Sequence, residues 1–184
     1  MRTTLIVSTL ALTGCIKAAP PVQAPQPWSV AVVTVLEAAE QSLISGAPDT
    51  LTESLRLAAD ERSLTPIVIE PESWLATFTA KRTTEQRVAS VAGTAQTDLL
   101  LVVETDARWY SQIAGRFRWT VDVDITFGRS EDASAAAHQH FEVPVALLFD
   151  HQREAEAVAE ATPIIERRVN ELMDTWLRAA TVPE

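Results

Sequence analysis

The clearest pattern in the chain is an alternation of apolar and polar residues between Phe117 and Phe127. Odd positions carry apolar side chains, and even positions carry arginine, threonine or aspartate. Successive side chains of a strand point to opposite faces of a sheet, so this pattern predicts a strand with one buried and one wet face. A second period-2 stretch, from Phe141 to Phe149, follows a polar loop that begins at Gly128, and the two stretches predict an antiparallel hairpin.

Three further segments have the composition of strands. The continuous apolar run Leu99–Val103 indicates a strand buried on both faces. Trp28–Leu36 is rich in β-branched residues and predicts a first strand, although a helix running to about Ser45 fits nearly as well. Pro66–Glu70 predicts a short strand bounded by prolines.

Capping patterns predict two helices in the first half of the domain. Thr50 with Glu53, and Thr83 with Gln86, have the spacing at which a side chain caps a helix start. Between them, Pro71 suits the first turn of a brief helix.

The last segment, from His151 to about Ala180, predicts a long C-terminal helix. Pro163 falls inside it, so we expect the helix to restart there with Thr162 as its cap. Its apolar stripe is Ile165, Val169, Leu172 and Trp176.

This order of elements predicts an α+β or mixed α/β fold. We expect a mainly antiparallel sheet with helices packed on one face and a long C-terminal helix.

The first fourteen residues have the layout of a secretory signal peptide. Arg2 is followed by a mostly apolar stretch from Leu5 to Thr13, which is too short to span a bilayer. Leu12–Cys15 then resembles the lipobox of bacterial lipoproteins. The alternative is an ordinary buried cysteine in a folded N-terminal element.

The lipobox resemblance implies cleavage between Gly14 and Cys15 and a covalent lipid on Cys15, usually with a third acyl chain on its amine. Two or more acyl chains anchor a protein stably, at about 0.8 kcal/mol per buried CH₂ group. Ile16 stands where aspartate would retain such a protein in the inner membrane, so the resemblance implies an outer-membrane protein with its domain facing the periplasm. Inner-membrane and surface locations are the alternatives, and no other cofactor is expected.

The rest of the chain divides into a tether and one domain. Residues 16–27 contain four prolines and suit an extended linker, so residues 15–27 form the lipidated cysteine and tether and residues 28–184 the domain. Twelve residues at about 3.1 Å each reach about 37 Å at most.

Composition excludes several classes of function. The chain has 47% hydrophobic residues, enough for a core, and a net charge of -10 that opposes binding to nucleic acid. Its five glycines form no phosphate-binding loop. A single cysteine excludes disulfide frameworks and cysteine-based zinc sites.

Two histidines are the weak candidates for a metal site. His138 and His140 project to one face of the second hairpin strand, with Glu142, and Asp122 and Asp124 occupy the matching face of the first. Imidazole and carboxylate suit zinc or a similar ion. The simpler interpretation is a solvated sheet face without a metal.

No catalytic residues are identified. Asp98 and Glu104 flank the apolar run, and Glu70 and Glu72 flank a proline, but strand-end carboxylates are usually solvated. No nucleophile motif surrounds the serines considered, which are Ser42, Ser45 and Ser111. The chain is therefore not expected to be an enzyme.

Trp109 and Tyr110 are the candidate partner contact. They lie near Gly115, a predicted turn, and aromatic residues are common hot spots of interfaces. Partial burial in the core is the alternative. Arg116 and Arg118 are expected to point outward, because the aromatic residues between and after them belong to the core-facing set.

The order of elements, with the segment Ala95–Val103, is similar to the small periplasmic domain shared by penicillin-binding-protein activator lipoproteins, curli-secretion lipoproteins and the TolB N-terminal domain. The similarity covers roughly residues 28–180, and no functional residue is carried over. The short tether departs from the long linkers of the synthase activators. It suits better the lipopolysaccharide-assembly lipoprotein, which has a similar α/β module.

The residues and these resemblances together favour a non-enzymatic membrane-anchored lipoprotein that binds, or assists the assembly of, another envelope protein or complex. The contact is expected at the sheet edge or at the Trp109–Tyr110 turn. A periplasmic lipoprotein that binds a small molecule or glycan is the alternative.

Overall fold

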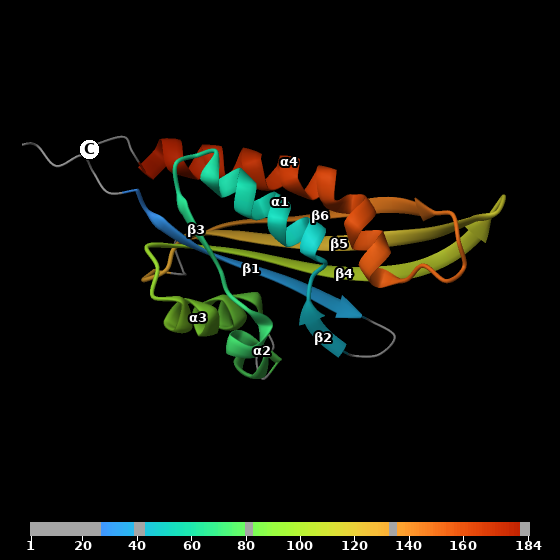
Figure 1. The fold of residues 1–184 in the computed structure, drawn as a ribbon, viewed down its shortest axis with the longest axis horizontal. Helices are drawn as coiled ribbons and strands as arrows, with labels where there is room; N and C mark the ends of the chain where they lie inside the picture. The colour runs from blue at the N-terminus through green and yellow to red at the C-terminus, as the bar shows by residue number, and fades with distance from the viewer. Residues whose placement is uncertain (1–26, 39–42, 80–82, 133–135, 181–184) are drawn as a thin grey trace, which may run out of the picture.

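The computed structural model describes residues 27–38, 43–79, 83–132 and 136–180. A six-stranded sheet has the order β2-β1-β4-β5-β6, and β3 pairs with β1 beside β2 (Figure 1). The strands are β1 Ser29–Ala38, β2 Leu43–Gly46, β3 Thr65–Val68, β4 Leu99–Ile113, β5 Arg116–Arg129 and β6 Ala137–Leu147. The helices are α1 Asp49–Asp60, α2 Pro71–Thr79, α3 Thr84–Ala95 and α4 Glu154–Ala180.

The predicted α+β class is confirmed. β1 runs parallel to β3 and β4, and the pairings β1–β2, β4–β5 and β5–β6 are antiparallel. β1 is a strand, so the alternative helix to Ser45 is wrong. The predicted hairpin of β5 and β6 is also present.

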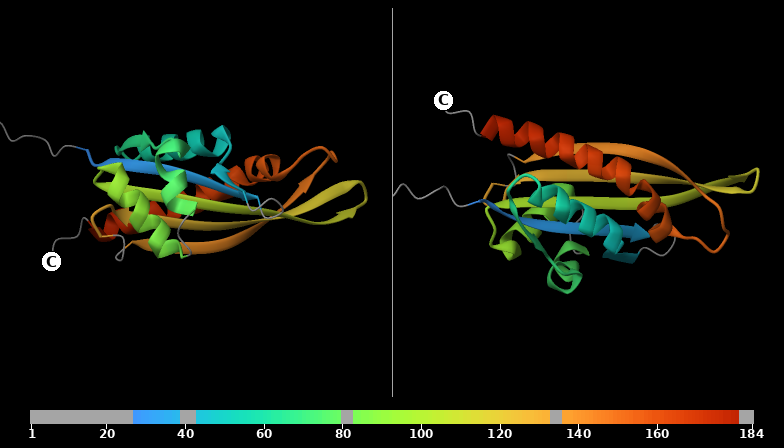
Figure 2. Two further views of the ribbon diagram at one scale, coloured as in Figure 1. Left: turned by 90° about the horizontal axis from the view of Figure 1, so that it is seen from below. Right: turned by 45° about the horizontal axis from the view of Figure 1, so that its top comes forward.

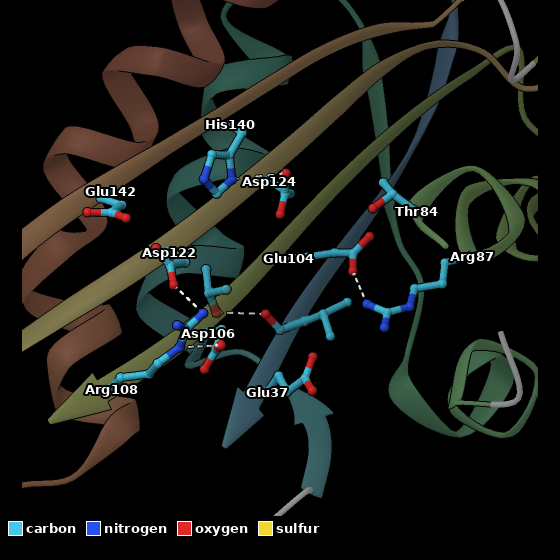
Figure 3. Close-up of a pocket in the computed structure, with 12 residues that line it drawn as sticks. Glu37, Thr84, Arg87, Glu104, Asp106, Arg108, Asp122, Asp124, His140 and Glu142 are labelled. Carbon is cyan, nitrogen blue, oxygen red and sulfur yellow. Dashed lines mark hydrogen bonds and ion pairs between the residues drawn. The ribbon is translucent and has the colours of Figure 1, made fainter. Parts of the chain in front are cut away.

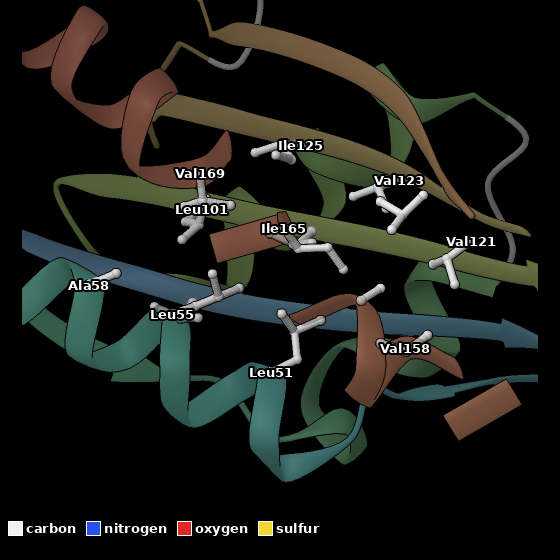
Figure 4. Packing of buried hydrophobic residues seen from close by; sticks show 14 of the residues in the cluster. Leu51, Leu55, Ala58, Leu101, Val121, Val123, Ile125, Val158, Ile165 and Val169 are labelled. Atoms are coloured by element: carbon white, nitrogen blue, oxygen red, sulfur yellow. The ribbon is translucent and has the colours of Figure 1, made fainter. Parts of the chain in front are cut away.

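One face of the sheet is covered by α1 and α4 (Figure 4). Leu51 and Leu55 of α1 and Ile165 and Val169 of α4 are fully buried there. They pack with the odd-numbered apolar residues of β5, as the alternation predicts, namely Val121, Val123, Ile125 and Phe127.

The other face is covered by α2 and α3 over β1 and β4 only (Figure 2). Trp74 and Phe78 of α2 and Val88 and Val91 of α3 are buried in this second cluster. The sheet residues they contact are Ala31, Val33, Val35, Leu100 and Val102. The expectation that the helices pack on one face is therefore wrong, because β1 and β4 are apolar on both sides and both sides need covering.

α4 is continuous, and the expected restart at Pro163 is wrong. Pro163 is exposed, while Thr162 donates its hydroxyl to the carbonyl of Val158 at 3.1 Å rather than capping a new helix. Residues on both sides of the proline, including Ala161 and Ile165, are buried on the same sheet face. This shared packing outweighs the missing amide donor.

The two expected helix caps have different outcomes. Thr83 caps α3, accepting a hydrogen bond from the Gln86 amide at 3.3 Å, as predicted. The Thr50 cap is wrong: α1 begins at Asp49, and Pro48 precedes it without a side-chain cap.

β4 and β5 extend well past β1, and β6 accompanies β5 as far as Phe117. The last residue of β4 paired with β1 is Ala107, and beyond it the two strands continue as a hairpin arm, residues 108–120, whose end projects from the body (Figure 2). Ala114 and Gly115 at its turn have φ of 51° and 74°. Positive φ at both central residues is typical of tight hairpin turns whose twist matches that of the strands.

The opposite end of the sheet holds both ends of the domain (Figure 1). Trp28, just before β1, meets Trp176 of α4 edge to face with 6.3 Å between ring centroids. Phe127 makes a similar contact with Trp176, at 5.3 Å. The arm and the chain ends therefore lie at opposite poles of the molecule.

Candidate functional site

The hairpin arm exposes large apolar side chains. Trp109, Tyr110 and Ile113 are 49%, 52% and 49% exposed. Such exposure is what an anchor for a partner requires, and the contact itself stays a prediction. Phe149 is likewise 56% exposed, because β6 ends at Leu147 and the expected alternation stops there.

A β-bulge positions the two aromatic residues. Trp109 pairs with Trp119, whereas the next pair joins Ser111 to Arg118, so Tyr110 is the extra residue. In a bulge, two residues of one strand oppose a single residue of the other. Trp109 and Tyr110 are thus both set opposite Trp119.

The two faces of the arm differ in chemistry. Trp119 is 5% exposed and continues the apolar face of β5. Arg116 and Arg118 alternate with the aromatic residues and so lie on the opposite face, as predicted. Between Ala107 and Val121 the chain has three arginines and no carboxylate, although the protein as a whole is acidic.

The face that carries these arginines continues into a polar groove beside α3, which we call the sheet-face groove (Figure 3). Its volume is about 360 Å³. Six carboxylates and two arginines line it, along with His140. The carboxylates are Glu37, Glu104, Asp106, Asp122, Asp124 and Glu142.

Ion pairs link the walls of the groove. Arg87 of α3 lies 2.6 Å from Glu104 of β4, and its guanidinium also lies over the Phe78 ring. Arg108 pairs with Asp106 at 2.8 Å and with Asp122 across the β4–β5 ladder.

Burial raises the pKa of Glu104, and the neighbouring charges of Asp124 and Glu37 raise it further, while Arg87 acts in the opposite direction. The hydrogen bond and charge of Asp106 raise the pKa of Arg108. Among the described residues, no hydrogen-bond partner is found for Glu104 Oε1, Asp106 Oδ1 or Arg87 Nε, all of which are buried.

The two histidines share one aspartate. His138 Nε2 and His140 Nδ1 lie 3.3 Å and 3.2 Å from the same oxygen of Asp124. Within the part of the chain that the structure describes, no three histidine, cysteine, aspartate or glutamate side chains are grouped to hold a metal ion. His138, His140 and Asp124 lie close together but are not arranged as a set of metal ligands.

The carboxylates that flank the apolar run do not converge. Asp98 accepts hydrogen bonds from the amide and hydroxyl of Ser29 at 2.8 Å and 2.6 Å, which lowers its pKa and ties the start of β4 to that of β1. Glu104 instead faces Arg87 in the groove. Neither arrangement pairs an acid with a base.

The groove itself was not foreseen from the sequence. It depends on α3 packing against the second sheet face, which brings Arg87 to Glu104. The one available signal was the doubly apolar run Leu99–Val103, which indicates cover on both sides of the sheet.

The expected cleavage site and lipidation site, Gly14 and Cys15, lie outside the described residues, as does the tether. Among the helices in the described ranges, none is both long and apolar enough to cross a membrane.

No protein-family model matches the chain, and no curated protein matches it. Some solved structures have a similar path of the backbone. One is a protein from Xanthomonas campestris, which is 16% identical in sequence; the match covers 88% of this chain and 94% of that one, with a TM-score of 0.46. A lipoprotein from Neisseria meningitidis has 14% identity, 78% and 99% coverage and a TM-score of 0.39. The LpoB C-terminal domain from Salmonella enterica has 9% identity, 70% and 87% coverage and a TM-score of 0.30.

Proteins named as lipoproteins are thus among the similar structures. At these identities and TM-scores, the likeness says nothing of what this chain binds.

Proposed function

We propose that this chain is a non-enzymatic lipoprotein, anchored in the outer membrane through Cys15, that binds another envelope protein through the aromatic face of its hairpin arm. The observation that carries the proposal is the exposure of Trp109 and Tyr110 at the pole opposite the chain ends. Exposed aromatic residues on a rigid element suit an interface, because they bury much area and lose little conformational freedom.

The fold supports this use of the arm. The arm's two strands are hydrogen-bonded to each other up to Ile113 and Arg116, so the aromatic residues are held by a ladder rather than by a loop. The chain enters the domain at the other pole, beside Trp28. An anchor there leaves the arm pointing away from the point of attachment.

Photo-crosslinking tests the contact. A photoreactive amino acid replaces Tyr110 in the full-length protein in its own cells, and a matched variant carries it at Arg167, an exposed residue of α4. We expect one envelope protein to be captured at Tyr110 and not at Arg167. Capture of a glycan or small molecule alone, or equal capture at both positions, contradicts the proposal.

The captured partner then permits an affinity measurement. Trp109→Ala is expected to weaken binding by about tenfold or more, as for a hot-spot aromatic residue. Leu57→Ala is the control, because Leu57 is 46% exposed on α1, away from the arm. Unchanged affinity in Trp109→Ala refutes the assigned contact.

The anchor is tested separately by labelling with a palmitate analogue. The natural chain should incorporate the label, and Cys15→Ala should not. Equal labelling of the two proteins, or none in the natural chain, contradicts lipidation at Cys15.

A further inference from the structure

The second face of the arm carries charged side chains that form no ion pair with other described residues. Arg116 and Arg118 lie on it with Ile113, which pairs with Arg116 and is 49% exposed. No described residue forms an ion pair with Arg116 or Arg118. This cationic face lies toward the projecting end of the β4–β5 hairpin, where Arg118 still pairs with Ala146 of β6 (Figure 2).

The adjoining sheet-face groove has the opposite properties. It is concave, and its six carboxylates exceed its two arginines by four charges, counting histidine as neutral. Arg87 and Arg108 form their ion pairs with Glu104, Asp106 and Asp122 (Figure 3). Among the described residues, Glu37, Asp124 and Glu142 form no ion pair with an arginine, although the charge of Glu142 acts on Arg108 and two histidines lie beside Asp124. The unpartnered oxygens of Glu104 and Asp106 add acceptors that have no donor.

The cationic face and the groove lie side by side on one face of the sheet. Arg118 and Asp122 are four residues apart on β5, which is about 13 Å along a strand. Arm and groove belong to the same two strands, so the arm of one copy lies beside its own groove and not over it. A second copy related by a two-fold axis through this face would bring each arm to the groove of the other.

We infer that two copies of this chain associate face to face through a reciprocal contact between the cationic face of each arm and the sheet-face groove of the other. A two-fold interface is self-complementary, so both contacts form at once. Two chains of net charge -10 repel each other overall. The arm is locally positive, so its contact with the negative groove of the second copy is attractive at short range. The aromatic face, with Trp109, stays uncovered and free for the partner proposed above.

Paired charge reversals test this contact. The full chain is used with Cys15→Ser, so that no detergent micelle adds to the measured mass. One variant carries Arg116→Glu and Arg118→Glu, a second carries Glu37→Arg and Glu142→Arg, and Arg167→Glu on α4 is the control for net charge.

We expect the reference chain and the Arg167→Glu control to sediment as dimers at micromolar concentration. Each double variant alone should dissociate about tenfold or more readily, because the arm reversal sets like charges against the groove and the groove reversal removes the four excess negative charges of the groove. An equimolar mixture of the two double variants should restore the dimer, since both reciprocal contacts again join opposite charges.

A reference chain that is monomeric throughout the concentration series overturns the inference. So does a dimer that both double variants leave intact, or a mixture that remains monomeric. Circular dichroism checks folding. If a reversal variant fails to fold, Arg116→Gln with Arg118→Gln replaces the arm variant, and Glu37→Gln with Glu142→Gln replaces the groove variant. Photo-crosslinking at Tyr110 is independent of these outcomes, so the proposed partner contact can stand or fall separately.

Discussion

The ion pair between Arg87 and Glu104 offers a quantitative test of how the groove is held together. Arg87→Ala removes the cation of α3 that lies 2.6 Å from Glu104 on β4. Only 20% of the Arg87 side chain and 12% of the Glu104 side chain are exposed, so water replaces the lost interaction poorly. The variant leaves a buried carboxylate without its counter-ion.

Removing one partner of a buried pair costs about 3 to 5 kcal/mol, and the partial exposure here favours the lower end. Loss of the cation–π contact with Phe78, at 5.2 Å, adds to the cost. We therefore expect Arg87→Ala to lower the free energy of unfolding at neutral pH by about 3 kcal/mol. Adding Glu104→Gln to Arg87→Ala should recover part of this loss, because no buried charge then remains.

The cost should depend on pH in a defined direction. Burial holds the pKa of Glu104 above its ordinary value, and removal of Arg87 takes away the main influence that lowers it. Between the unfolded and folded pKa values, the folded protein binds a proton that the unfolded chain has released. Stability therefore falls as pH rises through this interval, and acidification towards it should reduce the cost of Arg87→Ala.

Urea denaturation at neutral pH and near pH 5 measures both effects. Arg56→Ala is the matched control, because its pair with Glu53 is of similar length, 2.7 Å, but is exposed, and we expect no measurable change. A loss below about 0.5 kcal/mol for Arg87→Ala, or an identical loss at both pH values, refutes the reasoning.

Two further predictions concern packing and backbone conformation. Ile165→Ala should lower the free energy of unfolding by about 3 kcal/mol, since the Ile165 side chain of α4 is fully buried against the sheet. A loss under about 1 kcal/mol in urea denaturation contradicts this. Gly115→Ala should destabilise by about 1 kcal/mol, because φ is 74° although nothing crowds the added Cβ. Gly93→Ala, equally uncrowded but inside α3, should instead stabilise by up to about 1 kcal/mol, and equal shifts in the two variants would disprove the conformational argument.

The sequence predicts best where a single periodicity decides the structure. The alternation from Phe117 to Phe127 placed β5, its buried side and the polar face with Asp122 and Asp124. β4 proved longer than its apolar run, because Glu104 to Ile113 gains strand structure from pairing with β5 rather than from its own composition.

The structural features that the sequence did not predict depend on contacts between residues far apart in the chain. Pro163 is a strong local signal for a break, yet the buried residues around it keep α4 continuous. The run Leu99–Val103 indicates cover on both faces, but the parallel pairing of β1 with β4, which builds the apolar surface under α2 and α3, is not visible in any short stretch. The sequence proposed Trp109 and Tyr110 as a contact but did not predict the bulge that sets both of them opposite Trp119.

The edge contact between Trp28 and Trp176 has a practical consequence for protein engineering. Because the entrance to β1 and the end of α4 are neighbours, a reporter fused after the final helix would sit near the attachment pole and leave the opposite tip unobstructed. The same proximity lets a short peptide join the two ends. Circular permutants, or insertion of the whole unit into a host loop, thus become practical ways to display the hairpin on another scaffold.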